Sequence, residues 1–277
     1  MRRGVMPSIS LLYPEVSGGC MRFRPCIDIH NGKVKQIVGG TLMDEGDKAR
    51  ENFVSEQDAS WFAALYRDAD LPGGHVILLN SPDSPYYEAT RRQAFLALGT
   101  YPGGLQLGGG VNPENACAYL DAGASHVIVT SYVFRDGRIR WENLEQMVRS
   151  VGRSRLVLDL SCRKKDGKYY IVTDRWQKFT DTVLTPEMMH TLSSFCDEFL
   201  VHAVDVEGKA SGVEKPLASM LSECTERPVT YAGGVGSEKD LEDLKVYGKG
   251  RVDVTVGSAL DIFGGTLSFN RFLQKNL

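Results

Sequence analysis

The stretch LQLGGGVNPENA, residues 105–116, returns 124 residues later as VTYAGGVGSEKD, residues 229–240. In each copy a short apolar run ends in consecutive glycines and then leads into residues that favour the start of a helix. A second matching element follows each copy, SHVIVTSYVF at 125–134 and RVDVTVGSALDIF at 251–263. The chain therefore contains an internal repeat, and a repeat of this kind predicts a pair of similar sites.

Short β-rich runs alternate with amphipathic helical patterns from Met21 onward, which predicts a parallel sheet with crossover helices. The eight predicted strands are 23–29, 75–80, 104–108, 126–131, 155–161, 198–204, 228–233 and 251–257. Eight strand–helix units in about 250 residues predict a (β/α)8 TIM barrel, here built from two half-barrel repeats. A doubly wound open sheet is the alternative. That fold usually has fewer strands and a G-x-G-x-x-G motif after the first, whereas the first strand here ends in DIHNGK.

The composition is that of a globular protein with a large core: 42% of the 277 residues are hydrophobic and 24% are charged. The net charge of −3 and the lack of a basic stripe make nucleic acid a poor candidate partner. The six cysteines are scattered without a C-x-x-C pair, so we expect neither a disulfide nor a metal site. No apolar run is long enough to span a membrane, and we expect a cytoplasmic monomer.

The domain organisation follows from where the strand pattern starts. A strand pattern begins at once at Met21, so we interpret residues 1–20 as a dispensable extension and 21–277 as a single barrel domain. The extension has no acidic residue before Glu15, which keeps the remnant of a targeting peptide open as an alternative.

The glycine clusters predict two phosphate sites. In TIM barrels the chemistry lies at the carboxyl ends of the strands, and phosphate commonly binds between the loops after strands 7 and 8. Glycines let backbone N–H groups approach an anion, and helices that start at Asn112–Pro113 and at Ser237 would add their N-termini. The predicted phosphate-binding residues are Gly109, Gly110, Thr130 and Ser131 in the first copy, and Gly233, Gly234, Gly257 and Ser258 in the second.

We call the phosphate-binding residues of the first copy the first cradle and those of the second copy the second cradle. The two cradles lie on opposite sides of an eight-stranded ring, so the predicted ligand is a small molecule with a phosphate at each end. The alternative is structural, because glycines at helix starts also allow close helix packing in barrels that bind nothing there.

The repeat extends to two aspartates. Asp28 ends strand 1 and Asp159 ends strand 5, and each precedes an NG or DG pair that predicts a hairpin flap. Strands 1 and 5 face each other, so a substrate held between the two cradles would pass between two carboxylates equipped for acid/base work. In the alternative interpretation each aspartate caps a helix or pairs with a nearby lysine. For Asp28 that lysine is Lys33, which is also a candidate substrate contact.

Weaker candidates follow strand 6 and the second flap. The segment VHAVDVEGK offers His202, Asp205 and Glu207, and TDRWQK offers Trp176, which could stack on a planar ring. A lone histidine or tryptophan is more often a packing residue.

Taken together, RPCIDIHNGKVKQIVGG, GGLQLGGGV, LVLDLSCRKKDGKYYIVTDRWQKF, DEFLVHAVDVEG and DVTVGSALDIFGG resemble the histidine-biosynthesis isomerase that acts on phosphoribosylformimino-aminoimidazole carboxamide ribotide, in its eukaryote-like branch. The resemblance runs from Met21 almost to the C-terminus. It implies an Amadori rearrangement of an aminoaldose to an aminoketose, without cofactor or metal, on a substrate that carries two phosphates.

By this resemblance Asp28 matches the general base of the family and Asp159 its acid, although which residue plays which part here is an inference. The chain departs from the common bacterial form at Gln36, where an arginine is usual, and in the loop after strand 6. Alignment on the glycine of that loop places Glu207 at the acidic position, and a gap would place Asp205 there. We therefore include both as candidates for a third catalytic group.

Two other functions remain open. The first is the cyclase of imidazole-glycerol phosphate synthesis, a related half-barrel repeat, which PCIDI alone would fit. The second is a non-catalytic sensor of a bisphosphorylated metabolite. Loss of one carboxylate would leave a sensor largely intact but should cripple an enzyme.

Overall fold

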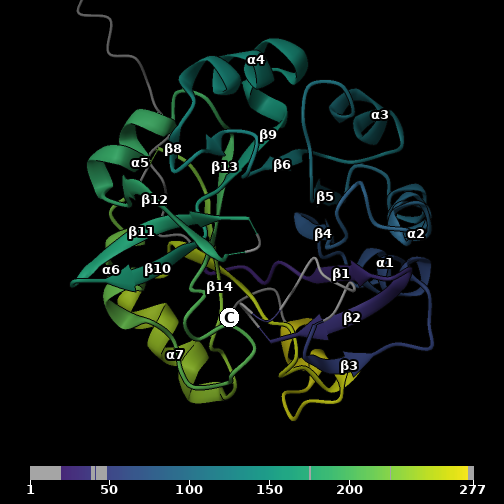
Figure 1. The fold of residues 1–277 in the computed structure, drawn as a ribbon. Helices are drawn as coiled ribbons and strands as arrows, with labels where there is room; N and C mark the ends of the chain where they lie inside the picture. The colour runs from purple at the N-terminus through teal and green to yellow at the C-terminus, as the bar shows by residue number, and fades with distance from the viewer. Residues whose placement is uncertain (1–19, 39–40, 42–48, 175, 225, 274–277) are drawn as a thin grey trace, which may run out of the picture.

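A closed ring of eight parallel strands, surrounded by helices, forms the molecule (Figure 1). The computed structural model describes residues 20–38, 41, 49–174, 176–224 and 226–273. Around the ring the strands are β1 (Cys26–His30), β4 (Gly74–Leu78), β5 (Leu105–Gly108), β6 (Val127–Val129), β9 (Leu156–Asp159), β13 (Glu198–His202), β14 (Val229–Ala232) and β15 (Val252–Thr255). The eight predicted strands are confirmed, with ends that differ by up to three residues.

The ring closes between its first and last strands. The residues just before β1 run beside β15: Arg24 N donates to Val254 O at 2.8 Å, and Val254 N donates to Arg22 O at 2.9 Å. Phe23 and Val254 form a parallel bridge at the same place. Closure leaves no edge on the ring, so the fold is a TIM barrel and the doubly wound alternative is wrong.

The helices connect consecutive strands. They are α1 (Ala59–Asp68), α2 (Tyr87–Thr100), α3 (Ala116–Asp121), α4 (Trp141–Val151), α5 (Pro186–Leu192), α6 (Lys215–Leu221) and α7 (Glu238–Tyr247), with 3-10 turns at Arg153–Arg155, Asp261–Phe263 and Phe269–Leu273. Ser237 caps α7 as expected, its side chain accepting from Asp240 N. The helix predicted to start at Asn112–Pro113 instead begins at Ala116. The Asn112 side chain accepts from Glu114 N and Asn115 N, which holds a turn ahead of the helix.

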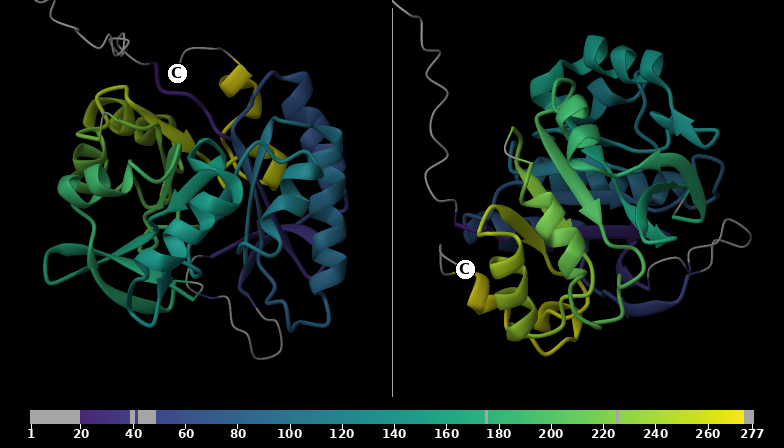
Figure 2. Two further views of the ribbon diagram at one scale, coloured as in Figure 1. Left: turned by 90° about the horizontal axis from the view of Figure 1, so that it is seen from above. Right: turned by 90° about the vertical axis from the view of Figure 1, so that its left-hand side faces the viewer.

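Two flaps project from one end of the barrel (Figure 2). The first consists of β2 (Lys33–Ile37) and β3 (Glu51–Val54), and the second of β10 (Cys162–Lys165), β11 (Lys168–Thr173) and β12 (Lys178–Val183). Asn31–Gly32 and Asp166–Gly167 form the tight turns, with φ of 52° and 73° in the first and 50° and 77° in the second. Positive φ at both central positions is the type I′ geometry that NG and DG predict. A third hairpin, β7 (Phe134–Arg135) with β8 (Arg138–Ile139), was not predicted.

Side chains along each strand point alternately outward and inward, and they form two separate apolar cores. Outward residues such as Leu156 and Leu158 of β9 join the large core between barrel and helices. Inward residues form a small separate cluster inside the barrel, made of Ile128, Val157 and Leu200 with Ile77. Side chains two residues apart on a strand share a face. Asp159 and His202 therefore point into the barrel, one layer nearer the carboxyl ends than Val157 and Leu200.

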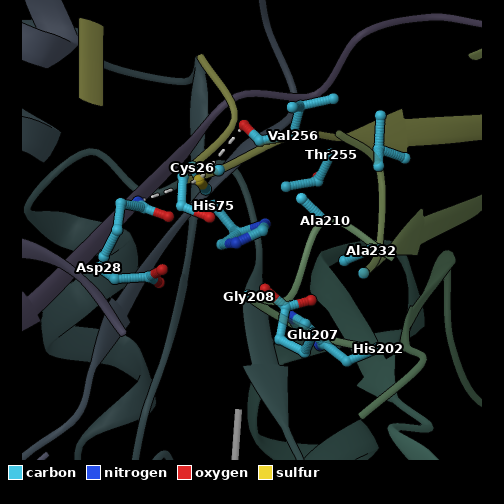
Figure 3. A pocket seen from close by; sticks show the side chains of 16 residues that line it. Cys26, Asp28, His75, His202, Glu207, Gly208, Ala210, Ala232, Thr255 and Val256 are labelled. Carbon is cyan, nitrogen blue, oxygen red and sulfur yellow. Dashed lines mark hydrogen bonds between the residues drawn. The ribbon is translucent and has the colours of Figure 1, made fainter. Parts of the chain in front are cut away.

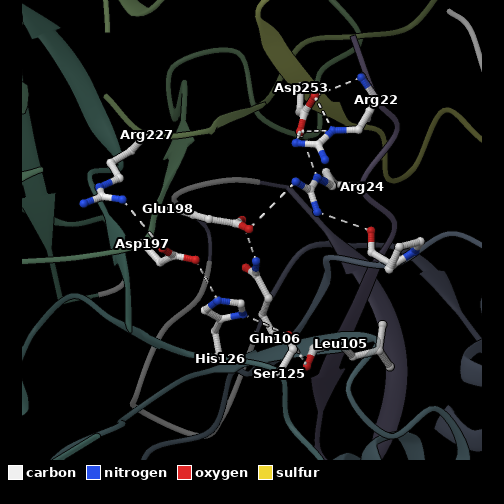
Figure 4. Close-up of polar contacts among 11 residues, drawn as sticks. Arg22, Arg24, Leu105, Gln106, Ser125, His126, Asp197, Glu198, Arg227 and Asp253 are labelled. Atoms are coloured by element: carbon white, nitrogen blue, oxygen red, sulfur yellow. Dashed lines mark hydrogen bonds and ion pairs between the residues drawn. The ribbon is translucent and has the colours of Figure 1, made fainter. Parts of the chain in front are cut away.

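The amino ends of the strands carry a polar layer inside the barrel (Figure 4). Arg24 pairs with Asp253 at 2.9 Å, and Gln106 donates to Glu198 at 2.7 Å. Arg24 and Asp253 come from opposite ends of the chain, so their ion pair reinforces the closure of the ring. His126, Asp197 and Glu198 place ligand atoms within 4.8 Å of one another, as a metal site could. We assign no metal there, because Gln106 and Arg227 already engage the two acids.

Three further expectations concern the chain as a whole. The extension 1–20 lies outside the described residues except for Cys20. No helix among the described residues is long and apolar enough to cross a membrane. All six cysteines fall within the described residues and none is joined in a disulfide there; Cys20 and Cys117 are exposed.

Candidate active site

Two adjoining cavities open at the carboxyl ends of the strands. The larger has a volume of about 550 Å³ and the smaller about 30 Å³. Asp28, His202 and Glu207 line both cavities, so these three side chains form the wall between them. Figure 3 shows Asp28 on one side of the smaller cavity and Glu207 with His202 on the other.

The first predicted cradle lines the larger cavity. Gly109, Gly110, Thr130 and Ser131 all contribute to its wall, together with Asp159 and Trp176. Gly109 and Gly110 have φ of 101° and 70°, which L side chains rarely adopt. A Cβ on Gly109 would lie 2.1 Å from Leu78 O, so packing alone also demands this glycine. A Cβ on Gly110 would meet only Pro82 Cγ, at 3.9 Å, so there the positive φ is the constraint.

The second predicted cradle lines the smaller cavity. Gly233, Gly234, Gly257 and Ser258 form part of its wall. Gly233 and Gly234 have φ of 119° and 76°, which repeats the conformation of the first cradle. The two glycine pairs therefore have similar positive φ values at equivalent places in the two half-barrels.

The loop after β13, residues 203–213, packs over the second cradle. Gly212 N donates to Gly234 O at 2.9 Å, and a Cβ on Gly236 would lie 2.5 Å from the Cβ of Ala210. A cavity of about 30 Å³ holds only a few water molecules. Occupation of this cradle by a phosphate group would require this loop to move outward.

Asp28 is partly buried in the wall between the cavities, and its carboxylate has no hydrogen-bond partner among the described residues. Burial raises its pKa to about 7; the His202 charge opposes this rise and the Glu207 charge adds to it. A carboxylate with a pKa near neutrality can accept and return a proton under physiological conditions.

Asp159 lies in a different environment, fixed by hydrogen bonds. Ser161 N donates to its Oδ1 at 2.8 Å, the Ser161 hydroxyl donates to the same oxygen, and Thr130 Oγ1 donates to Oδ2 at 3.0 Å. Burial favours a higher pKa, but His202 and the Ser161 hydrogen bonds outweigh it and hold the pKa of Asp159 below its usual range. The two predicted aspartates therefore differ sharply in their readiness to carry a proton.

The structure separates the two acids that the sequence left as alternatives after strand 6. Glu207 lines both cavities, and its Oε2 is buried with no hydrogen-bond partner among the described residues. Burial raises the pKa of Glu207, against the lowering effect of His202. Asp205 lines neither cavity: it pairs with Arg163 at 2.9 Å and accepts from Lys164 N at 2.8 Å, which ties the loop to the second flap. The geometry therefore disfavours Asp205 as a group that reaches a ligand.

Of the predicted substrate contacts Trp176 and Lys33, only Trp176 lines a cavity. Trp176 lines the larger cavity, and its ring centroid lies 5.2 Å from that of His202. Lys33 is exposed at the start of β2 and lines neither cavity, so the predicted substrate contact finds no support in the geometry.

Sequence reasoning missed several residues of the site. His75, Cys26 and Gln36 line the smaller cavity. The His75 ring meets the His202 ring edge-on at 5.9 Å, and burial lowers the pKa of His75 to about 3. Gln36 was noted only as a departure from the bacterial pattern; its Oε1 would lie 2.2 Å from a Cβ on Gly257, beside the second cradle. Ser161, which joins Asp159 to His202, gave no signal in the sequence.

The paired cradles predict where anions bind. In crystals grown with sulfate or phosphate we expect one anion near Gly109, Gly110 and Ser131, because positive-φ glycines expose backbone N–H donors there. A second anion near Gly234, Gly257 and Ser258 should accompany an outward shift of residues 203–213. Anions bound only at helices remote from these loops would contradict the assignment of the cradles.

The fold and the site define a class: a TIM barrel with a twofold internal repeat, whose two glycine cradles flank a centre of three carboxylates and a histidine. The family model described as "Histidine biosynthesis protein" matches residues 22–267, and the chain belongs to this family. The resemblance drawn from the sequence is confirmed.

Three similar proteins share one name. The chloroplastic 1-(5-phosphoribosyl)-5-((5-phosphoribosylamino)methylideneamino)imidazole-4-carboxamide isomerase of Medicago truncatula is 55% identical over 253 residues, covering 90% of this chain and 80% of the relative. The isomerase of the same name from Neurospora crassa is 45% identical over 88% of this chain and 93% of its own length. That of Saccharomyces cerevisiae is 43% identical over 89% of this chain and 94% of its own length.

Proposed function

We propose that this chain is the isomerase of histidine biosynthesis that converts phosphoribosylformimino-5-aminoimidazole carboxamide ribotide, an aminoaldose, to its phosphoribulosyl aminoketose. The main support for this function is the wall that Asp28, His202 and Glu207 form between two cavities. One glycine cradle lines each cavity. A substrate with a phosphate on each ribosyl arm would place its reacting carbons at this wall.

The rearrangement needs four proton transfers, two during ring opening and deprotonation of C2 and two during collapse of the enaminol. In ring opening, a proton reaches the furanose ring oxygen, the C1–O bond breaks towards that oxygen, and the lone pair of the amine forms C1=N. A base then removes the C2 proton, and the electron pair of the C–H bond forms C1=C2 as the C=N pair returns to nitrogen. The enaminol becomes the ketone when C1 gains a proton and the hydroxyl on C2 loses one: the O–H electron pair forms C2=O and the C1=C2 pair forms the new C1–H bond. Two protons are gained and two are lost, so the net change is zero and no oxidant is needed.

Asp28 is the proposed base. It lies at the shared wall without a competing hydrogen bond, and a base with a pKa near 7 combines a large ionised fraction with useful basicity at neutral pH. Asp159 and Glu207 complete the acidic set, and Asp205 has a structural part as the link to the second flap.

The two rival functions are less well supported. The relatives described above are named as isomerases, which disfavours the cyclase. A sensor needs no base tuned to neutrality, and burial of an unpartnered carboxylate is a cost that a pure binding site would not require.

An assay of the purified full chain on the aminoaldose bisphosphate, followed optically, tests the proposal. We expect conversion to the aminoketose without added metal. The optical signal should change faster when a cyclase is added to consume the product. Binding without turnover would favour the sensor. Formation of imidazole-glycerol phosphate from the aminoketose in the presence of ammonia would favour the cyclase.

Trp176 should contribute to substrate binding by stacking. Trp176→Ala should raise KM by roughly tenfold or more, since aromatic stacking contributes about 1 kcal/mol and a cavity wall is lost as well. Trp61→Ala, which removes an exposed tryptophan on α1, is the matched control. An unchanged KM together with a lower free energy of unfolding would mean that Trp176 only packs.

Location and assembly complete the proposal. We propose a monomer in the cytoplasm, whereas the Medicago truncatula relative is named chloroplastic. Fractionation of cells that express the chain with and without residues 1–20 tests the compartment. Light scattering at micromolar concentration tests the assembly, and a mass of twice 30.6 kDa would contradict the monomer.

A further inference from the structure

Ser161 lies between Asp159 and His202, buried at the start of the second flap. Its Oγ donates to Asp159 Oδ1 and lies 3.0 Å from His202 Nδ1, whereas Asp159 Oδ1 and His202 Nδ1 are 3.9 Å apart. The serine hydroxyl is thus the bridge between the acid and the imidazole.

The number of available hydrogens fixes the direction of this bridge. An ionised carboxylate can only accept, and a hydroxyl has one hydrogen to donate. Ser161 gives its hydrogen to Asp159, so its contact with His202 must be one in which Nδ1–H donates to Oγ. His202 therefore carries a hydrogen on Nδ1, and Nε2 has no hydrogen-bond partner among the described residues. His202 lines both cavities, so a ligand in either would meet this ring.

Asp159 is poorly suited to donate a proton. Three donors converge on its two oxygens, from Ser161 N, Ser161 Oγ and Thr130 Oγ1. Protonation at Oδ1 would place a donor against the Ser161 N–H, and protonation at Oδ2 would require the Thr130 hydroxyl to turn from donor to acceptor. The role of acid that the resemblance gives to Asp159 therefore does not fit its surroundings.

We propose that Asp159 and Ser161 are positioning residues that orient His202, and that His202 Nε2 delivers the proton that opens the furanose ring. The inference rests on the proposed isomerase function and deepens it. The Nε2–H bond breaks as the O–H bond forms on the ring oxygen, and the imidazole returns to its neutral form with Nδ1–H still held by Ser161.

The charges around His202 support this role. Asp159 on β9, Glu207 on the loop after β13 and Asp28 on β1 face it, and His75 on β4 lies beneath it. Burial opposes the charged imidazole, but Asp159, Glu207 and Asp28 outweigh it and raise the pKa of His202. His75 stays neutral above its pKa of about 3 and adds no repulsion at neutral pH. The protonated imidazole and the ionised Asp28 stabilise each other, so the acid and the base are ready in the same state of the enzyme.

The hydrogen-bonded chain from Asp159 through Ser161 to His202 is called the relay here. Nitrogen NMR of the protein without substrate tests this relay and needs no activity assay. In protein labelled with ¹⁵N-histidine, we expect the His202 signals, identified by their loss in His202→Asn, to report hydrogen on Nδ1 at every pH and an imidazolium that persists above pH 6.5. In Ser161→Ala the imidazolium should titrate at lower pH. A neutral Nε2–H form in the unsubstituted protein would overturn the proposal, whether or not the chain is an isomerase.

Kinetics tests the proton transfer. Ser161→Ala should lower kcat by about tenfold or more with little change in KM, and should move the alkaline limb of the pH profile to lower pH. The matched control is Ser222→Ala, which removes a buried hydroxyl bonded to Ser219 O at 2.6 Å, remote from both cavities.

Glu207 is the competing proton donor. His202→Asn should lower kcat at least about a hundredfold, the usual contribution of a general acid, and Glu207→Gln should cost less. If His202→Asn remains active while Glu207→Gln is inactive, the proton donor is Glu207 and the relay proposal is wrong. An unsubstituted chain that binds the substrate but does not turn it over would refute the isomerase and leave the NMR result to decide the hydrogen-bonded relay.

Discussion

Asp28→Asn should lower the turnover of the isomerisation by at least about a hundredfold, because the amide keeps the shape of the carboxylate and cannot accept the C2 proton. The dissociation constant of the substrate should change much less, since the glycine cradles rather than Asp28 are expected to hold its phosphates. Measurement of kcat by single turnover and of Kd by calorimetry on the same variant separates the two effects.

Asp159→Asn should cost a similar factor for a different reason: the amide would present a donor to Ser161 and break the relay to His202. The losses should be non-additive in the double variant, because both residues serve one reaction path. Asp205→Asn is the informative comparison, because Asp205 touches neither cavity. If Asp159→Asn stays nearly fully active while Asp205→Asn or Glu207→Gln is dead, the acid belongs to the loop after β13. If all four variants keep their activity, the argument from opposed carboxylates fails.

The strand ends were the part of the site that the sequence could predict. Asp28 and Asp159 each close an apolar run and precede a turn dipeptide, so both their position along the strand and their flap followed from local pattern. The positive-φ glycines were equally visible, because few other residues could occupy those turns.

The sequence pattern could not predict which side chains face into the barrel. Strands buried on both faces are apolar almost throughout, so HVILLN does not reveal that His75 and Ile77 face inward. That assignment depends on the closure of the ring and on the register of each strand. Similarly, the loop after β13 has no periodicity, and only its folded path shows that Glu207 turns into the cavity while Asp205 turns towards Arg163.

The same desolvation that makes the Asp28 carboxylate a base should make it costly to the fold. Its pKa of about 7 in the folded protein lies above the ordinary value of 3.8, so between these values the folded state holds a proton that the unfolded chain has released. The contribution of Asp28 to stability therefore falls as pH rises through that window, and above about pH 7 the folded state carries the full cost of a buried charge. Holding the pKa of Asp28 at about 7 in place of 3.8 corresponds to a cost on the order of 4 kcal/mol.

Asp28→Asn should accordingly raise the free energy of unfolding while it abolishes turnover, as expected where an active site is maintained at the expense of stability. At pH 8 the gain should approach about 4 kcal/mol, and at pH 5, where the folded protein already holds the proton, it should be smaller by roughly 2 to 3 kcal/mol. Urea denaturation at the two pH values measures both, with Asp121→Asn on the exposed end of α3 as control. Equal gains at pH 5 and pH 8 would show that desolvation does not raise the pKa of Asp28, and its assignment as the base would lose its physical ground.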